Sequence, residues 1–126
     1  MQWSHFFPLW PPSLNHAWRS APMSKNPYLS DEVRKFRRDM YAEILVARSK
    51  HQIPRGTIEG PVAVTLRFYP PDLRRWDLDN RPKAIFDALT HAMVWLDDEQ
   101  VYQLDSAKCQ VNPHDGGFWI CLRTLS

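Results

Sequence analysis

The stretch VAVTLRFYPPDLRRWDLDNRPKAIFDALTHAMVWL, Val62 to Leu96, is central to the fold. It joins a strand, an acidic turn (residues 77–80, called the acidic segment below) and a helix. Its beginning has an apolar side chain at every second position of residues 62–68, which predicts a strand with one buried face. Pro70 and Pro71 end this strand, because proline cannot donate a hydrogen bond to a neighbouring strand. The acidic turn therefore lies between a strand and the helix that follows.

The helix is predicted to begin near Pro82, since proline is favoured at the first helical position. The apolar residues after it recur three and four positions apart, which is the spacing of one helical face. This pattern extends the predicted helix to about the segment WLDDEQ, residues 95–100. Its apolar positions are Ile85, Ala88, Leu89, Ala92, Met93 and Leu96.

Before this stretch, the sequence predicts a first strand over residues 3–9 and a long loop from Trp10 to Tyr28. A helix with Ser30 as its N-cap follows the loop. The residues of that helix that recur at helical spacing are Val33, Phe36, Met40, Ile44 and Ala47. Strands over Val101–Val111 and Phe118–Leu125 complete the chain. The order strand, helix, strand, helix, strand, strand predicts an α+β fold, with one mixed sheet of about four strands packed against two main helices.

The totals are those of a globular protein with a single domain over residues 1–126, since 44% of the residues are hydrophobic and 24% are charged. The net charge of +2 does not by itself indicate a nucleic-acid partner. Cys109 and Cys121 form no CxxC pair and are expected to be reduced thiols. No signal peptide or membrane-spanning run is evident, so we expect a cytoplasmic protein with no membrane partner.

Two pairs of carboxylates flank the predicted second helix. Asp77 and Asp79 precede it, and if their backbone is extended their side chains point to the same side. Asp97 and Asp98 follow it, and a helix separates its two ends by about 1.5 Å per residue. One of the later acids can therefore join the first pair only if the tertiary fold brings it there.

Crowded carboxylates repel each other unless a cation compensates their charge. Mg²⁺ suits this arrangement, because it takes oxygen ligands and binds through one or two carboxylates together with water and substrate phosphates. Lys83 falls in the first turn of the helix, where the helix dipole disfavours a cation, so a phosphate could be its partner. Two such ions can promote cleavage of a phosphodiester.

Other readings of these residues stay open at this point. A lone Asp-x-Asp is weak evidence, and Asp77, Asp79 and Asn80 could instead form a cap and turn for the helix. Lys83 could be an ordinary solvated lysine. A calcium-binding EF-hand loop is excluded, because Pro82 stands where that loop needs glycine. The five histidines lack zinc-ligand spacing, and no nucleophile–histidine arrangement is evident.

The segment WDLDNRPKAIFDALTHAMVWLDDEQV, Trp76 to Val101, resembles the signature of the RusA-type Holliday-junction resolvases, which are small endonucleases of phage and bacteria. The shared elements are Asp-Leu-Asp-Asn, a lysine three residues on, Asp-Ala-Leu, Leu-Asp-Asp and Gln-Val. The segment WPPSLNHAWR, Trp10 to Arg19, resembles the Pro-Pro-Ser-x-Asn element of the same family. Trp76 and Pro82 depart from the family pattern, which leaves the details of DNA contact open.

The resemblance implies a homodimer that binds four-way junction DNA and makes paired, Mg²⁺-dependent nicks, with Mn²⁺ as an alternative ion. It implies that Asp77, Asp79 and Asp98 bind the metal and that Lys83 is the catalytic or phosphate-contacting lysine. Asn80 and Asp97 are expected to support these ligands. The residues expected to contact DNA are Asn15, Arg19, Arg74, Arg75, Arg81 and Lys108.

Two alternative functions come from other classes. A module of the same fold that binds DNA junctions without cutting them is the first, although it would have no reason to keep Asp77, Asp79, Asp98 and Lys83 together. A nucleotide-sugar transferase that uses an Asp-x-Asp motif is the second, but it needs a larger nucleotide-binding domain than 126 residues provide. Incubating a synthetic four-way junction with the protein and Mg²⁺ separates the first alternative from a nuclease.

Overall fold

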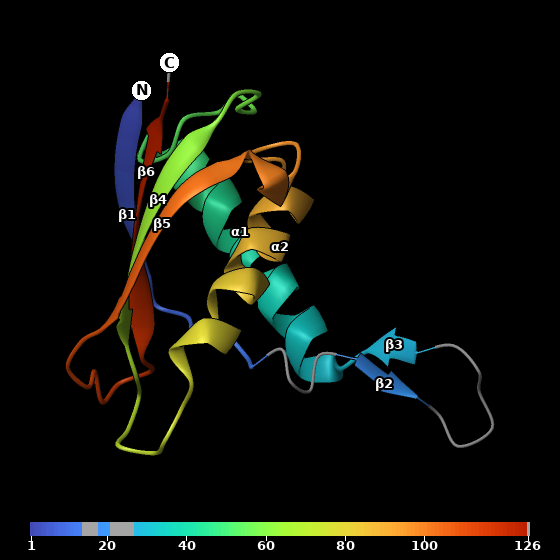
Figure 1. Ribbon diagram of the computed structural model, residues 1–126, viewed down its shortest axis with the longest axis vertical. Coiled ribbons are helices and arrows are strands. Elements are labelled where there is room, and N and C mark those ends of the chain that lie inside the picture. Colours follow the sequence, from blue (N-terminus) through green and yellow to red (C-terminus); the bar gives the residue numbers. More distant parts are fainter. Residues whose placement is uncertain (14–17, 21–26, 126) are drawn as a thin grey trace.

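The computed structural model describes residues 1–13, 18–20 and 27–125, with backbone only for 18–20 and 27–29. A four-stranded sheet in the order β1-β6-β4-β5 forms the main layer (Figure 1). Its strands are β1 (Gln2–Phe7), β4 (Val62–Tyr69), β5 (Val101–Lys108) and β6 (Gly117–Thr124). β4 pairs with β5 in parallel and with β6 antiparallel, and β1 pairs antiparallel with β6. This mixed sheet confirms the predicted fold class.

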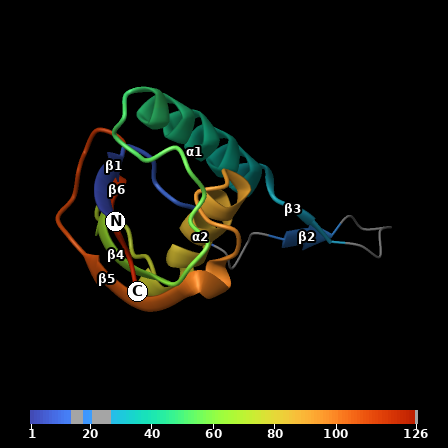
Figure 2. The ribbon, with the colours of Figure 1, turned by 90° about the horizontal axis from the view of Figure 1, so that it is seen from above.

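Two helices, α1 (Asp31–Ser49) and α2 (Pro82–His91), pack on the same face of this sheet (Figures 1 and 2). Ser30 caps α1 by accepting a hydrogen bond from the backbone of Val33, as predicted. The five apolar residues expected on the inner face of α1 are all buried. α2 begins at Pro82, as predicted, and crosses between two parallel strands, β4 and β5.

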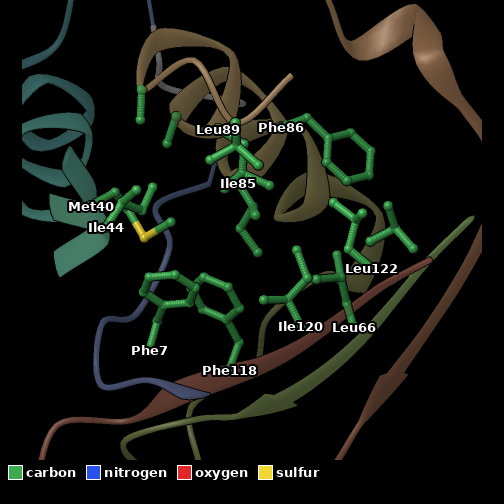
Figure 3. Packing of buried hydrophobic residues seen from close by; sticks show 14 of the residues in the cluster. Phe7, Met40, Ile44, Leu66, Ile85, Phe86, Leu89, Phe118, Ile120 and Leu122 are labelled. Atoms are coloured by element: carbon green, nitrogen blue, oxygen red, sulfur yellow. The ribbon is translucent and has the colours of Figure 1, made fainter. Parts of the chain in front are cut away.

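The core lies between the sheet and the two helices. Alternate residues of β4 and β6 point into it, and α1 and α2 cover them from above (Figure 3). The side chains labelled in Figure 3 are Phe7, Met40, Ile44, Leu66, Ile85, Phe86, Leu89, Phe118, Ile120 and Leu122. Because β4 is buried on this face along its whole length, the acidic segment that follows it starts from a fixed point.

The structure differs from the sequence-based expectations in several places. β1 ends at Phe7, two residues before the predicted end of the first strand. A short hairpin, β2 (Trp18–Ser20) and β3 (Pro27–Leu29), lies within the segment predicted to be a loop, and it projects from the rest of the molecule (Figures 1 and 2). α2 ends at His91 rather than near residue 96, and Met93 has a left-handed backbone with φ of 59°. Strand β5 ends three residues earlier than expected.

Two simpler expectations can also be compared with the structure. Cys109 and Cys121 are free thiols, as predicted. In the part of the chain that the structure describes, no helix is long and apolar enough to cross a membrane.

Candidate active site

The first acidic pair lies in the connection from β4 to α2. Asp77 has an extended backbone, but Asp79 lies in a short 3₁₀ helix, η2 (Leu78–Asn80). The condition under which the two side chains would point to the same side, an extended backbone at both residues, is therefore not met, because the chain turns at Leu78. Asn80 donates a hydrogen bond from its amide to Asp77 over 3.4 Å, which ties the two ends of this turn together.

The helix-capping alternative for these residues finds no support. The residue before α2 is Arg81, and no side chain forms a capping hydrogen bond there. Asp77, which precedes η2, forms no side-chain cap either. Both Asp77 and Asp79 are exposed to solvent, so their carboxylates are open to an ion or a substrate.

Lys83, in the first turn of α2, contacts one carboxylate within this helix and one that follows it in the chain. Its ammonium group donates a hydrogen bond to Oδ2 of Asp98 and lies 2.9 Å from Oδ1 of Asp87. The hydrogen bond to Asp98 raises the pKa of Lys83, with a smaller contribution from Asp87 and an opposing one from partial burial. The same hydrogen bond lowers the pKa of Asp98. Lys83 is therefore a charged group in contact with two carboxylates, rather than a free lysine on the surface.

Asp98 reaches Lys83 because the chain that returns from α2 is held in place. Asp97 caps a second 3₁₀ helix, η3 (Asp98–Gln100), by accepting a hydrogen bond from the backbone of Glu99 over 3.0 Å. Gln100 is buried and accepts hydrogen bonds from the backbone of Leu96 and Asp97. The same side chain donates to the carbonyls of two residues that precede β4, Ile58 and Gly60.

Asp79 and Lys83 also lie on one groove, which has a volume of about 490 Å³. The other residues that line this groove are Leu78, Pro82, Phe86, Leu104 and Ser106. Leu104 and Ser106 belong to β5, so the groove runs between α2 and the edge of the sheet. The structure therefore places Asp79 and Lys83 on one groove and brings Asp98 into contact with Lys83.

A second pocket, of about 330 Å³, is lined by residues that come directly before and after the acidic segment. Arg74, Arg75 and Arg81 are among them. Arg81 donates a hydrogen bond to the carbonyl of Pro11, and its guanidinium lies 5.0 Å from the centre of the Trp10 ring. Partial burial lowers the pKa of Arg81 below its ordinary value. Arg81 thus anchors the acidic segment to the chain that follows β1.

Arg74 and Lys108 both contact residues that precede the acidic segment. Arg74 pairs with Asp72 at 2.9 Å, and its hydrogen bonds lower the pKa of Asp72. Lys108 donates a hydrogen bond to the carbonyl of Trp76 over 2.6 Å, and its ammonium lies 4.5 Å from the centre of the Trp76 ring. Lys108 therefore holds the residue immediately before Asp77.

The N-terminal candidates are described less fully. Asn15 lies outside the described residues, and of Arg19 only the backbone, in β2, is described. Their predicted contacts with DNA stay predictions.

The chain is similar in sequence to known proteins over most of its length. The sequence profile of the family described as Endodeoxyribonuclease RusA matches residues 8–114. The chain belongs to this family. It is also 38% identical over 102 residues to the crossover junction endodeoxyribonuclease RusA of Escherichia coli K12, covering 81% of this chain and 79% of that protein. Relatives of the same description from Enterobacteria phage 82 and Shigella sonnei Ss046 are 38% and 37% identical over the same shares.

The donor chemistry of this RusA-family chain fits a hard divalent ion, because carboxylate oxygens are the ligands that Mg²⁺ prefers. The carboxylates are not gathered into a metal site in this structure. Within residues 1–13, 18–20 and 27–125, no three His, Cys, Asp or Glu side chains are grouped closely enough to hold a metal ion. Binding one ion with Asp77, Asp79 and Asp98 together needs a rearrangement of these side chains. The metal ligand set stays a prediction.

Two residues that support this RusA-family site were not singled out as site residues from the sequence. Gln100 holds the return segment, and a signal for it existed, since Asp97 and Gln100 have the spacing of a capping box and the two side chains form one. Asp87 contacts Lys83, and its signal was the four-residue spacing between an acid and a lysine on one helix.

Proposed function

We propose that this chain is a Mg²⁺-dependent, structure-selective endodeoxyribonuclease that resolves four-way DNA junctions by paired nicks. The observation that carries the proposal is the contact between Lys83 and Asp98, which joins the lysine and the Leu-Asp-Asp parts of the family signature in space. The relatives described as crossover junction endodeoxyribonucleases support the choice of substrate.

Asp77, Asp79 and Asp98 are the residues that would hold Mg²⁺, with Mn²⁺ as an alternative ion. When bound, such an ion supplies Lewis-acid activation of water and of the scissile phosphate. The exposure of Asp77 and Asp79 supports this role, since ion and phosphate must both reach them from solvent.

Lys83 is proposed to donate hydrogen bonds to a phosphate oxygen near the scissile bond. Its pKa is raised, so it carries its proton and is unsuited to act as a general base. An ammonium group in this position stabilises the negative charge that grows on the phosphate during cleavage. Asn80 is proposed to orient Asp77 through their hydrogen bond, and Asp97 to orient Asp98 through the η3 cap.

The basic residues around the acidic segment are proposed to receive the DNA backbone. Arg74 and Arg75 are exposed and line a pocket together with Trp76 and Arg81, which suits contact with phosphates. We also propose that the protein acts as a homodimer, because two equal sites match the two-fold symmetry of a junction cut on two strands. Its DNA substrate and its free cysteines are consistent with a cytoplasmic location.

The substitution Asp79→Asn tests the proposed reaction. It keeps the size of the side chain and removes the charge, so Mg²⁺-dependent nicking of a synthetic four-way junction should fall about 100-fold or more. The junction Kd, measured by gel shift with Ca²⁺ in place of Mg²⁺, should stay within about threefold. The matched control is Asp105→Asn, since Asp105 is an exposed acid whose carboxylate pairs with Arg67 on the sheet.

Two outcomes would count against the proposal. Equal loss of binding and nicking in Asp79→Asn would indicate a residue needed for folding or assembly. Junction binding by the wild-type protein with no nicking under Mg²⁺ or Mn²⁺ would instead identify a non-catalytic DNA-binding module.

A further inference from the structure

Asp87 is the acid of the Asp-Ala-Leu element, and its carboxylate has a different partner on each oxygen. Oδ1 lies 2.9 Å from the ammonium of Lys83, one turn earlier on α2. Oδ2 lies 3.8 Å from the guanidinium of Arg37, which belongs to α1. A chain of charged groups therefore runs from α1 through Asp87 to the lysine of the candidate active site.

Arg37 is placed differently from the cations beside it on α1. Arg34 and Lys35 pair with acids of their own helix and are largely exposed. Only 28% of the Arg37 side chain is exposed, and its Nε atom is buried with no hydrogen-bond partner among the described residues. Burying a guanidinium costs free energy unless a negative charge compensates it, and Asp87 supplies that charge.

Helix stabilisation alone explains the Lys83–Asp87 pair poorly. Pairs of this kind contribute about 0.3–0.5 kcal/mol, and an acid that precedes the lysine is the better order. Here the lysine precedes the acid and stands in the first turn, where the helix dipole opposes its charge. The pair is therefore better explained by holding the ammonium of Lys83 in place than by stabilising α2.

We propose that Asp87 and Arg37 are positioning residues that hold the ammonium of Lys83 beside the scissile phosphate. This inference rests on the proposed function. Lysine has a flexible four-carbon stem and would otherwise move among several anions. Its other carboxylate partner, Asp98, is a proposed metal ligand whose charge would be shared with the ion, so Asp87 is the partner that remains.

Arg37 makes this anchor rigid. Because α1 and α2 pack together in the core, a carboxylate that is held from α1 on one oxygen presents its other oxygen in a fixed direction. An ammonium group fixed in this way is pre-organised for the transition state, and misplacing such a group by about 1 Å can lower a rate about 100-fold.

The kinetic test compares Asp87→Asn, Arg37→Gln and Arg37→Lys with the wild type, using single-turnover nicking of a four-way junction at saturating Mg²⁺. Asp87→Asn and Arg37→Gln should lower the nicking rate about tenfold or more, while the junction Kd changes less than about threefold. Arg37→Lys keeps the charge and should recover part of the rate. The matched control is Asp39→Asn, which removes an acid that pairs with Lys35 at the same four-residue spacing within α1.

A second measurement does not depend on cleavage. The ¹³C relaxation of the lysine ε-methylene groups reports how ordered the Lys83 side chain is, and Asp98→Asn removes its other partner. Lys83 should stay ordered in Asp98→Asn and become as mobile as the exposed Lys50 in Asp98→Asn combined with Asp87→Asn. Thermal unfolding of each variant confirms that it is folded.

The two measurements separate this inference from the proposed function. If the wild-type protein does not nick DNA, the proposed function fails, and the relaxation data still decide whether Asp87 orders Lys83. Equal mobility of Lys83 with and without Asp87 would overturn the inference, and so would a nicking rate in Asp87→Asn that matches the Asp39→Asn control.

Discussion

Single cations around the acidic segment are used in two ways. Arg81 and Lys108 contact backbone carbonyls and tryptophan rings of their own chain, so they shape the segment. Arg74 and Arg75 line the same region but face solvent, and the side chain of Arg74 is 90% exposed although it pairs with Asp72. The second pair is therefore better placed to meet a phosphate.

Replacing both Arg74 and Arg75 by glutamine should weaken junction binding in a salt-dependent way. Each phosphate contact contributes a slope of about −0.9 to the logarithm of the binding constant against the logarithm of salt concentration. The double variant should therefore reduce the slope by about one to two for each protomer bound to the junction. Binding titrations by fluorescence anisotropy between about 50 and 200 mM salt measure this slope.

Arg55→Gln is the control for this prediction, because Arg55 is an exposed cation in the connection from α1 to β4. It carries the same charge and should leave the slope nearly unchanged. If the double variant and the control give the same slope, Arg74 and Arg75 do not contact the DNA backbone.

The sequence identified the candidate residues of the site but not the contacts among them. The acidic segment and Lys83 were identified from residue type and spacing. The contact between Lys83 and Asp98 could not be predicted, because it depends on how the chain returns after α2. The partnership of Asp87 with Arg37 joins residues of two helices, and spacing along one helix cannot reveal it.

Among the elements of the fold, the connection from α2 to β5 matters most for the site. Arg48 donates hydrogen bonds to the carbonyls of Ala92 and Met93, and Trp95 donates from its ring to the hydroxyl of Thr90. With the hydrogen bonds of Gln100, these contacts fix a connection that has little regular structure. Asp98 is thus placed by polar contacts rather than by a helix or strand.

Gln100→Ala should therefore destabilise the protein and impair the site together. The substitution leaves the carbonyls of Ile58 and Gly60 and two backbone N–H groups without their partner. A buried group left unpaired costs about 1–3 kcal/mol, but only the bond to Ile58 is fully buried, and the other three groups are partly open to water and cost less. We expect the free energy of unfolding, measured by urea denaturation, to fall by about 2–4 kcal/mol. The nicking rate should also fall at temperatures where the variant stays folded.

Gln103→Ala is the matched control, because Gln103 is exposed on β5 and its loss should change the free energy of unfolding by less than about 0.5 kcal/mol. Similar losses in the two variants would show that Gln100 has no special role in holding the connection.

The elements with a clean period were predicted well. β4 alternates along its whole length, and the apolar face of α1 is buried as expected. The end of α2 was misplaced because Ala92, Met93 and Leu96 continue the helical spacing in the sequence. The backbone of Met93 is left-handed and ends the helix, so Val94 and Trp95 are the residues that pack into the core there. The β2–β3 hairpin was missed because its strands have three residues each, too few for a period to show.

For the whole molecule, the homodimer is the prediction with the widest consequence. One chain provides one Asp-Leu-Asp-Asn segment and one Lys83, whereas two symmetric nicks need two of each. Sedimentation equilibrium should therefore give a mass about twice the 14.9 kDa of one chain. A mass of one chain throughout the concentration range that supports nicking would contradict this prediction.

The order of the strands also affects when the protein can fold. β4 is synthesised before β5 and β6, its two neighbours in the sheet, and β1 pairs with β6, so Gln2 stays without its partner Arg123 until β6 has been synthesised. Pairings between such distant residues form slowly. A growing chain on the ribosome therefore carries the acidic segment without the sheet that supports it, and cutting activity should arise only after the last strand has been released.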